Sequence, residues 1–281
     1  MKKIDLLQDK AVEIRKKLLK MIFKSGTGHT GGSLSSTDIL TVLYYEILNI
    51  DSKNPEKENR DRFILSKGHS IEAYYCILAD LGFIREKELD TFCQYKTRLI
   101  GHPSNKVPGI EMNTGALGHG LSVAAGMAKA AKMDDKLYKV YTLMGDGEQA
   151  EGSIWEAAMS AAHYKLDNLV GIIDRNKLQI TDETEKVMSL EPLAQKWKAF
   201  GWKVKRVNGH DHQELLDVLS SIPFSKNKPS LIIAETVKGK GVSFIENRPE
   251  WHHGVPDKDQ LKQALKELSV KLEKTGADNN E

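Results

Sequence analysis

Met144-Gly-Asp-Gly147 and, further along, Asp174-Arg-Asn176 are the two stretches of sequence that decide the fold. Each follows an apolar run typical of a buried strand, Lys139–Met144 in the first case and Leu169–Asp174 in the second. Open α/β sheets bind ligands at the carboxyl ends of their strands. The two stretches therefore predict neighbouring strands of a parallel sheet with a ligand site at their ends.

The residue types at these strand ends suit a metal bound to a diphosphate. Asp146 and Asn176 offer hard oxygen ligands of the kind that Mg²⁺ or Ca²⁺ prefers, and these ions often share a phosphate group. Gly145 and Gly147 flank the aspartate and allow a phosphate to come close to the backbone. A tight turn accounts for either stretch alone, but the two together predict a metal and diphosphate site.

The rest of the chain alternates between strand-like and helix-like patterns. Further apolar runs predict strands at Phe63–Leu65, Lys203–Val207 and Ser230–Ala234. Helical spacing predicts helices at Leu6–Lys24, Ser36–Leu48, Ile71–Leu81, Leu121–Lys132, Ile154–Tyr164, Pro192–Phe200, Gln213–Ser220 and Asp259–Lys274. Near-continuous apolar strands separated by helices predict the α/β class, a parallel sheet flanked by helices on both faces.

We expect one diphosphate-binding domain over residues 1–281, with its core at about 10–260. Between the predicted elements, Ser25–Ser33 is a glycine-rich loop and Phe92–Met112 is irregular. Residues 261–281 form a polar C-terminal helix and tail, of which Gly276–Glu281 is expected to be frayed.

Composition excludes several classes of function. The 281 residues carry a net charge of +2 from scattered lysines and arginines, so a nucleic-acid partner is not expected. No apolar run approaches the roughly 20 residues of a membrane helix. Met1–Arg15 mixes charges of both signs and is not expected to be a signal peptide. Cys76 and Cys93 lack metal-type spacing, which indicates free thiols and a cytoplasmic protein.

The histidines fall into two groups. Glycine-rich loops bring backbone close to ligands, and histidine titrates near neutral pH. A single loop histidine is more often solvated than catalytic, but several in glycine-flanked loops indicate one site: His29, His69, His102, His119 and His253. The others are assigned to the scaffold, with His210 the weakest exclusion because a glycine precedes it: His163, His210, His212 and His252.

Glu151 and Glu156 are two carboxylates at the start of the predicted helix Ile154–Tyr164. Acidic residues there complement the helix dipole, which is a sufficient structural reason for them. The functional alternative is that one of them enters a subunit interface and relays charge to a cofactor.

Taken together, these motifs resemble those of the transketolases. The stretch from Gly145 to Asn176 resembles the thiamine diphosphate signature, which many enzymes share. The histidine loops narrow the resemblance to transketolases and their close relatives, and it extends from about residue 10 to 260. The loops that resemble those of transketolases are Gly28–Ser35, Leu65–His69, Gly101–Pro103, Asn113–Gly120, Lys238–Gly241 and His253-Gly254.

The resemblance implies thiamine diphosphate and Mg²⁺ (or Ca²⁺) as cofactors. It implies metal ligation by Asp146, Asn176 and the backbone carbonyl of Leu178. It implies cofactor contacts from His69, Leu117, Gly145, Asp146, Gly147, Glu148, Asn176 and His253.

It also implies that His29 and His102 handle substrate hydroxyls and protons, while His69 and His253 line the same catalytic site. Glu151 and Glu156 match carboxylates that link paired active sites across an interface. Two positions depart from the family pattern, His119 where Gln is common and Thr30 where Pro is usual.

In full-length transketolases this segment precedes a pyrimidine-binding domain and a third domain. We therefore expect the partner to be a separate C-terminal subunit, in a heterotetramer of two plus two. The expected reaction moves a two-carbon ketol unit from a ketose (phosphate) to an aldose (phosphate).

Alternative interpretations are part of a 1-deoxy-xylulose-5-phosphate synthase, a subunit of a 2-oxoacid dehydrogenase, or a non-catalytic thiamine-binding subunit. The loops at His29, His69 and His102 favour transketolase over the first two. Intact Asp146 and Asn176 argue against the third.

Overall fold

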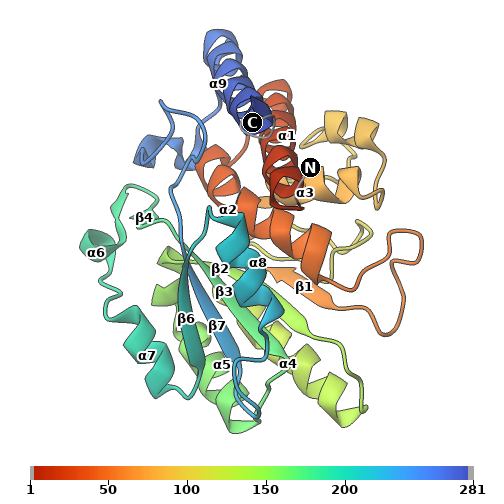
Figure 1. Cartoon of the computed structure of the whole chain (residues 1–281), viewed down its shortest axis with the longest axis vertical. Coiled ribbons are helices and arrows are strands. Elements are labelled where there is room, and N and C mark those ends of the chain that lie inside the picture. The colour runs from red at the N-terminus through yellow and green to blue at the C-terminus, as the bar shows by residue number, and fades with distance from the viewer. Residues whose placement is uncertain (1–2, 278–281) are drawn as a thin grey trace.

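A five-stranded parallel sheet forms the centre of the computed structural model, which describes residues 3–277, with side chains through residue 270 (Figure 1). The strand order is β1-β2-β3-β7-β6, and every pair in this sheet is parallel. The strands are β1 (Arg62–Leu65), β2 (Val140–Gly145), β3 (Leu169–Arg175), β6 (Lys203–Asn208) and β7 (Ser230–Glu235). The predicted strands and the parallel α/β class are thus confirmed.

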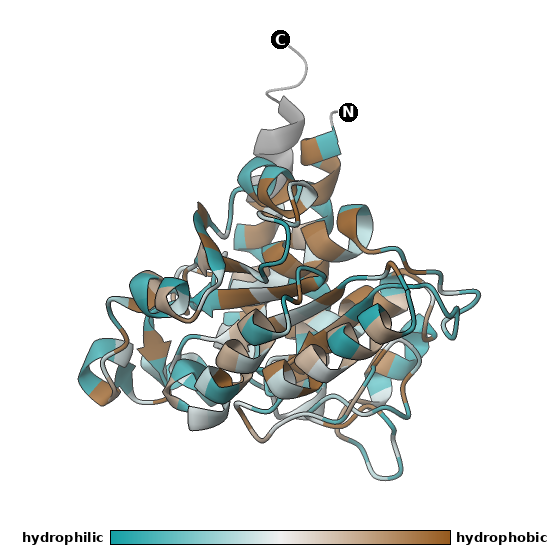
Figure 2. Ribbon diagram, turned by 90° about the horizontal axis from the view of Figure 1, so that it is seen from below, coloured by the Kyte–Doolittle hydropathy of each residue, from teal (hydrophilic) through white to brown (hydrophobic). Residues whose placement is uncertain are grey.

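Helices cover both faces of the sheet, as Figure 1 shows. On one side lie α1 (Lys3–Ser25), α2 (Thr30–Val42), α3 (Ile71–Asp80), α8 (His212–Ser220) and α9 (Lys258–Ala277). On the other lie α4 (Gly120–Met133), α5 (Gly152–His163) and α7 (Leu193–Ala199). In Figure 2 many helices show alternating brown and teal segments, because they bury an apolar stripe and expose a polar one, whereas α2 is buried along its whole length.

Central strand β3 divides its side chains between two hydrophobic cores. Val170 and Ile172 belong to the core under α1 and α2, whereas Leu169 and Ile173 belong to the core under α4 and α5. Successive side chains of a strand point to opposite faces, so a strand covered on both sides must be apolar throughout. This burial explains the uninterrupted apolar run in the sequence.

Several short elements connect these layers. One is η1 (Leu43–Ile47), a π-helical continuation of α2 that lies within the predicted helix Ser36–Leu48. The sequence did not predict the 3₁₀ turns, because they are too short to show a period: η2 (Glu86–Thr91), η3 (Gly147–Ala150) and η4 (Pro249–His253). A small antiparallel pair, β4 (Leu178–Gln179) and β5 (Asp182–Glu183), precedes the one-turn helix α6 (Thr184–Val187).

The predicted start of the second helix at Ser36 is wrong, because α2 begins at Thr30 inside the glycine-rich segment. Gly31 and Gly32 lie in its first turn, where other segments press against the helix. A Cβ on Gly31 would lie 2.8 Å from the carbonyl oxygen of Trp251, and one on Gly32 would lie 2.5 Å from Ser70 Oγ. The glycines thus serve close packing rather than loop flexibility.

At the carboxyl end, α9 runs on to Ala277, past the predicted end at Lys274. Most of the tail expected to fray, Gly276–Glu281, lies outside the described residues. Among residues 3–277, no helix is long and apolar enough to span a membrane.

We expect Ile172→Ala to lower the free energy of unfolding by about 2–5 kcal/mol, because it leaves a cavity in the central strand. Ile172 is completely buried. Denaturant unfolding of the purified chain measures the change. Leu137→Ala is the matched control, since that side chain is 95% exposed, and should change stability by less than about 0.5 kcal/mol. Equal effects of the two substitutions would contradict this assignment of the core.

Candidate active site

The predicted ligand residues lie at the carboxyl edge of the sheet. Gly145 at the end of β2 is paired in register with Asp174 near the end of β3. Asp146 and Asn176 follow on these two adjacent strands and are only 2% and 7% exposed. The Oδ2 atom of Asp146 accepts a hydrogen bond from the backbone N–H of Lys177 at 2.6 Å, so the two strand ends are in direct contact.

Asp174 is the polar centre of this edge. Its fully buried carboxylate forms an ion pair with Lys67 and accepts hydrogen bonds from Ser35 Oγ at 2.6 Å and from Thr236 Oγ1. Burial acts to raise the pKa of Asp174, but the Lys67 ammonium and the hydrogen bonds from Ser35 and Thr236 together hold that pKa below its usual value. One carboxylate therefore joins β3 to α2, to the loop after β1 and to the segment after β7.

Glu148 has a similar joining role on the other side of the turn. Its buried carboxylate accepts hydrogen bonds from Ser66 Oγ, from Gly118 N at 2.8 Å and from Gly145 N at 2.9 Å. Burial raises its pKa above the ordinary glutamate value. Glu148 therefore fixes the loop that carries Leu117 against the end of β2.

The oxygen atoms around Asp146 fit a hard cation. Asp146 supplies a carboxylate and Asn176 an amide oxygen, and Leu178, the first residue of β4, supplies a backbone carbonyl. The Oε1 atom of Gln179 is buried without a hydrogen-bond partner, and this side chain packs where a Cβ on Gly147 would stand. Burial, and next the nearby Asp174, raise the pKa of Asp146, although Arg175 forms an ion pair of 3.3 Å with its Oδ2 atom.

Four of the glycine-flanked histidines converge. The ring centroid of His29 lies 5.2 Å from that of His69, 6.2 Å from that of His102 and 4.6 Å from that of His253. These histidines come from four segments that are far apart in the sequence, and His29 is their common neighbour. The fifth, His119, is exposed at the start of α4 and makes no ring contact with them within the described part of the chain.

His252, which the sequence analysis assigned to the scaffold, belongs to this cluster. Its ring centroid lies 5.4 Å from that of His29 and 5.3 Å from that of His69. Its Nδ1 atom lies 3.0 Å from Nζ of Lys238, a buried amine. The sequence did not indicate a site role for His252, because no glycine stands beside it. Its position is set by η4, a short turn with no recognisable sequence pattern.

Burial lowers the pKa of four histidines of the cluster. Burial, and next the neighbouring His253, lower the pKa of His29 to about 3. Burial, and next the Lys238 ammonium, lower the pKa of His252 to about 4. Burial also lowers the pKa of His69 and of His102. Burial, and next the charge of Lys67, lower the pKa of Lys238 to about 8, so this amine remains mostly protonated at pH 7.

Glu72 is a supporting residue that sequence reasoning missed. Its fully buried carboxylate accepts hydrogen bonds from the backbone N–H of His29 at 2.7 Å and from Ser33 Oγ at 2.5 Å. Burial raises its pKa. Since both partners lie at the start of α2, Glu72 fixes the backbone of His29 in the cluster.

The remaining predicted residues lie outside this cluster. Glu151 is the N-cap of α5, and both Glu151 and Glu156 are exposed on its surface. His163 is exposed at the end of α5, as expected of a scaffold position. His210 bonds Asp38 at 2.6 Å and accepts from the backbone N–H of Val237, while His212 is buried near Asp38.

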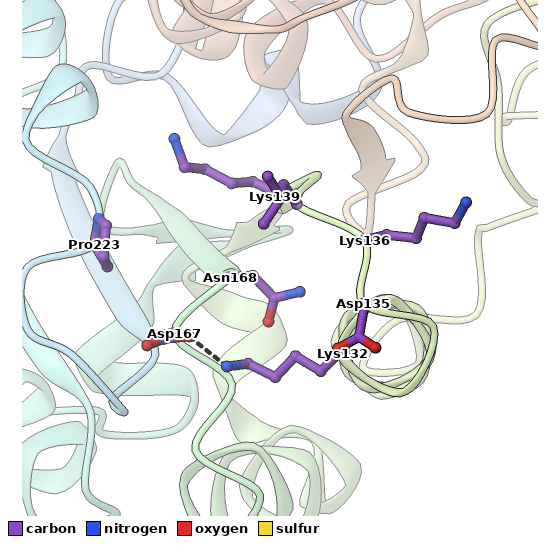
Figure 3. Close-up of a pocket in the computed structure, with 8 residues that line it drawn as sticks. Lys132, Asp135, Lys136, Lys139, Asp167, Asn168 and Pro223 are labelled. Carbon is purple, nitrogen blue, oxygen red and sulfur yellow. Dashed lines mark ion pairs between the residues drawn. The ribbon is translucent and has the colours of Figure 1, made fainter.

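A pocket of about 590 Å³ lies at the opposite, amino-terminal edge of the sheet (Figure 3). Lys139 and Asn168, which line it, come just before β2 and β3. Figure 3 shows Lys132 reaching Asp167, with which it forms an ion pair of 2.6 Å, while Lys136 points away from it. Lys136 instead forms an ion pair of 2.6 Å with Glu58, and this pocket lies at the edge of the sheet opposite to the predicted ligand residues.

A covered parallel sheet with acidic, amide and ammonium groups at its carboxyl edge defines an α/β protein that binds an anionic cofactor at its strand ends. The family described as the transketolase thiamine diphosphate binding domain matches residues 7–276. The chain belongs to this family and is a thiamine diphosphate-binding transferase subunit.

Relatives of the same length reinforce the assignment. The chain is 50% identical over 277 residues to an apulose-4-phosphate transketolase subunit of Phocaeicola vulgatus, covering 99% of each chain. It is 43% identical over 272 residues to the 6-deoxy-6-sulfo-D-fructose transketolase subunit SqwG of a Clostridium species, covering 96% of this chain and 98% of that one. A transketolase structure from Campylobacter jejuni matches with a TM-score of 0.89 and 33% identity, over 95% of this chain and 43% of that chain.

We expect Gly31→Ala to weaken thiamine diphosphate binding by about 10-fold or more, since the added methyl would push η4 and Lys238 away from α2. A Cβ at this position would meet the backbone oxygen of Trp251 at 2.8 Å and Lys238 Cγ at 3.0 Å. Calorimetric titration of the cofactor into the assembled protein measures the effect. Gly126→Ala is the matched control in α4, where an added Cβ meets nothing within 4 Å. Unchanged affinity in Gly31→Ala would refute the close-packing argument.

Proposed function

We propose that this chain is the cofactor-binding subunit of a split transketolase that moves a two-carbon ketol unit from a ketose to an aldose. The observation that carries the proposal is that the Asp146–Asn176 oxygen set and the histidine cluster lie at one edge of the sheet. The oxygen set suits a metal ion that is bound to a diphosphate, and the histidine cluster suits sugar hydroxyls. Relatives of the same length that are named transketolase subunits support the same function.

Mg²⁺ is the proposed metal, with Ca²⁺ as a substitute. Asp146, Asn176 and the carbonyl of Leu178 would hold it, because oxygen ligands suit both ions. Its charge would relieve the buried carboxylate of Asp146, whose pKa is raised by burial in the described structure.

Thiamine diphosphate would lie along this edge, and when bound it supplies the carbon atom that carries the two-carbon unit. Gly145 and Gly147 leave the strand end open to a phosphate, and Lys238 is a buried cation close by. We place His69, His253, Leu117 and Glu148 around the cofactor, with Glu148 acting through the loops that it holds.

His29 and His102 are proposed to handle the protons of sugar hydroxyls. A neutral imidazole offers one donor and one acceptor, so it can take a proton from a hydroxyl and return it. The lowered pKa values of both histidines keep them neutral at pH 7. Glu72 would support His29 by fixing its backbone.

The partner is proposed to be a C-terminal transketolase subunit that carries the pyrimidine-binding domain, in a heterotetramer of two plus two in the cytoplasm. This chain would act as one diphosphate-binding domain. Glu151 and Glu156 are exposed on α5, as carboxylates that enter such an interface must be before assembly.

The substrate is proposed to be a ketose with an anionic end. Two relatives are named for apulose-4-phosphate and for 6-deoxy-6-sulfo-D-fructose, which end in a phosphate and a sulfonate. At the described sheet edge, the buried cations Lys67 and Lys238 already contact Asp174 and His252. We therefore propose that the partner subunit binds the anionic end of the sugar.

We expect Asp146→Ala to weaken Mg²⁺-dependent thiamine diphosphate binding by about 100-fold or more, which corresponds to at least about 2.7 kcal/mol. The substitution removes the only carboxylate of the proposed metal-binding set. Calorimetric titration of the assembled enzyme gives the affinity. Asp167→Ala removes a carboxylate at the opposite edge and should leave the affinity unchanged. Equal affinities in Asp146→Ala and wild type would sink the metal assignment.

We expect the isolated chain to show no ketol transfer and the mixture with its partner to be active. The pyrimidine ring of the cofactor has no assigned binding group on this chain, and a stable complex of this kind buries roughly 2,000 Å² or more. Mass in solution and ketol-transfer assays, with thiamine diphosphate and Mg²⁺, are measured before and after the partner is added. Robust turnover by the chain alone would overturn the two-subunit proposal.

A further inference from the structure

His252 stands apart from the other histidines of the cluster in being held by a cation. Its Nδ1 atom lies 3.0 Å from Lys238 Nζ, while its half-buried ring lies against the rings of both His29 and His69. The ring is thus anchored at one nitrogen and lies between His29, which is proposed to handle sugar hydroxyls, and His69, which is proposed to contact the cofactor.

The contact with Lys238 fixes the tautomer of His252. A protonated lysine has three N–H donors and no acceptor, so Nδ1 must accept the hydrogen bond. The neutral imidazole then carries its hydrogen on Nε2. His252 is therefore a donor of fixed orientation whose acceptor side is already occupied.

The segment that carries His252 is fixed as firmly as the side chain. Thr30 Oγ1 donates a hydrogen bond to the carbonyl of Gly254 at 2.5 Å, and Thr30 is completely buried. The backbone N–H of Gly239, next to Lys238, donates to the carbonyl of Gly31 at 2.9 Å. The start of α2 thereby sets the positions of both His252 and Lys238, and the hydroxyl of Thr30 is a group that the usual proline lacks.

We propose that His252 is a substrate-contacting residue that donates from Nε2 to a hydroxyl or carbonyl oxygen of the ketose, with Lys238 and Thr30 as its positioning residues. This inference rests on the proposed ketol transfer and adds a specificity residue to it. Anchorage and recognition use different nitrogen atoms of the same ring, so substitutions can separate them.

Two variants test the roles of the two ring nitrogens of His252 separately. His252→Asn places an amide oxygen near the position of Nδ1, which keeps an acceptor for Lys238 and loses the Nε2 donor. His252→Gln places an amide N–H near the position of Nε2 and restores the donor. His163→Asn is the matched control, at an exposed position at the end of α5.

The measurements use the assembled enzyme with its partner, thiamine diphosphate and Mg²⁺. D-xylulose 5-phosphate is the donor sugar and D-ribose 5-phosphate the acceptor. KM and kcat are determined for the donor, and the cofactor Kd is measured by calorimetry. D-arabinitol 5-phosphate, an acyclic polyol phosphate that cannot react, is titrated separately to give an equilibrium Kd without turnover.

In His252→Asn we expect the donor KM and the Kd of the polyol phosphate to rise by about 10-fold, the size of one lost hydrogen bond. The cofactor Kd should stay within about 2-fold of wild type, and His252→Gln should recover most of the loss. His163→Asn should match wild type in every measurement.

An unchanged donor KM and polyol Kd in His252→Asn would overturn the inference. A rise in cofactor Kd that accompanies the KM change and that Gln does not reverse would also overturn it, since it would reduce His252 to an anchor for Lys238. Failure of the proposed function looks different, because the wild-type complex would then bind cofactor and transfer no ketol unit.

Discussion

The buried ion pair between Lys67 and Asp174 is the interaction on which the site depends. It lies at the carboxyl edge of the central strand, where Lys67 also donates to the carbonyl of Gly32 at 3.3 Å. Leaving one member of such a pair without the other in the interior is strongly destabilising, so the segments that provide both are held in one arrangement. Through the hydrogen bonds of Asp174 to Ser35 and Thr236, that arrangement extends to α2 and to the segment after β7.

Close packing of backbone segments against α2 fixes the same region of the site. Gly31 and Gly32 allow η4, Lys238 and Ser70 to press against the first turn of α2, and a methyl group at either position would collide with them. The same turn starts at His29, whose backbone Glu72 holds. Burial then lowers the pKa of the clustered histidines, so several imidazoles share a small volume without mutual repulsion. The same close packing therefore sets both the positions of these histidines and their lowered pKa values.

The sequence by itself determined the layers of the fold, the proposed metal ligands Asp146 and Asn176, and four histidines of the cluster. A strand buried on both faces must be apolar along its whole length, so β2 and β3 could be recognised without contacts, and with them Asp146 and Asn176 at their ends. The glycine-flanked histidines could also be selected from the sequence, because a neighbouring glycine is a local feature that needs no knowledge of contacts. This local signal correctly brought together His29, His69, His102 and His253, and it also selected His119, which makes no ring contact with them in the described part of the chain.

Only the tertiary structure decided which other side chains meet these residues. Glu72 lies in the first turn of the buried helix α3, where a sequence shows a carboxylate but not its two hydrogen-bond partners at the start of α2. The helix itself begins at Thr30 rather than Ser36, because the glycines that suggest a loop are needed for contacts with distant segments. His252 enters the cluster because a short 3₁₀ turn, fixed by Thr30 and Gly254, carries it there. The Thr30–Gly254 contact joins residues 224 positions apart and the Glu72–His29 contact residues 43 apart, so no local pattern in the chain encodes either.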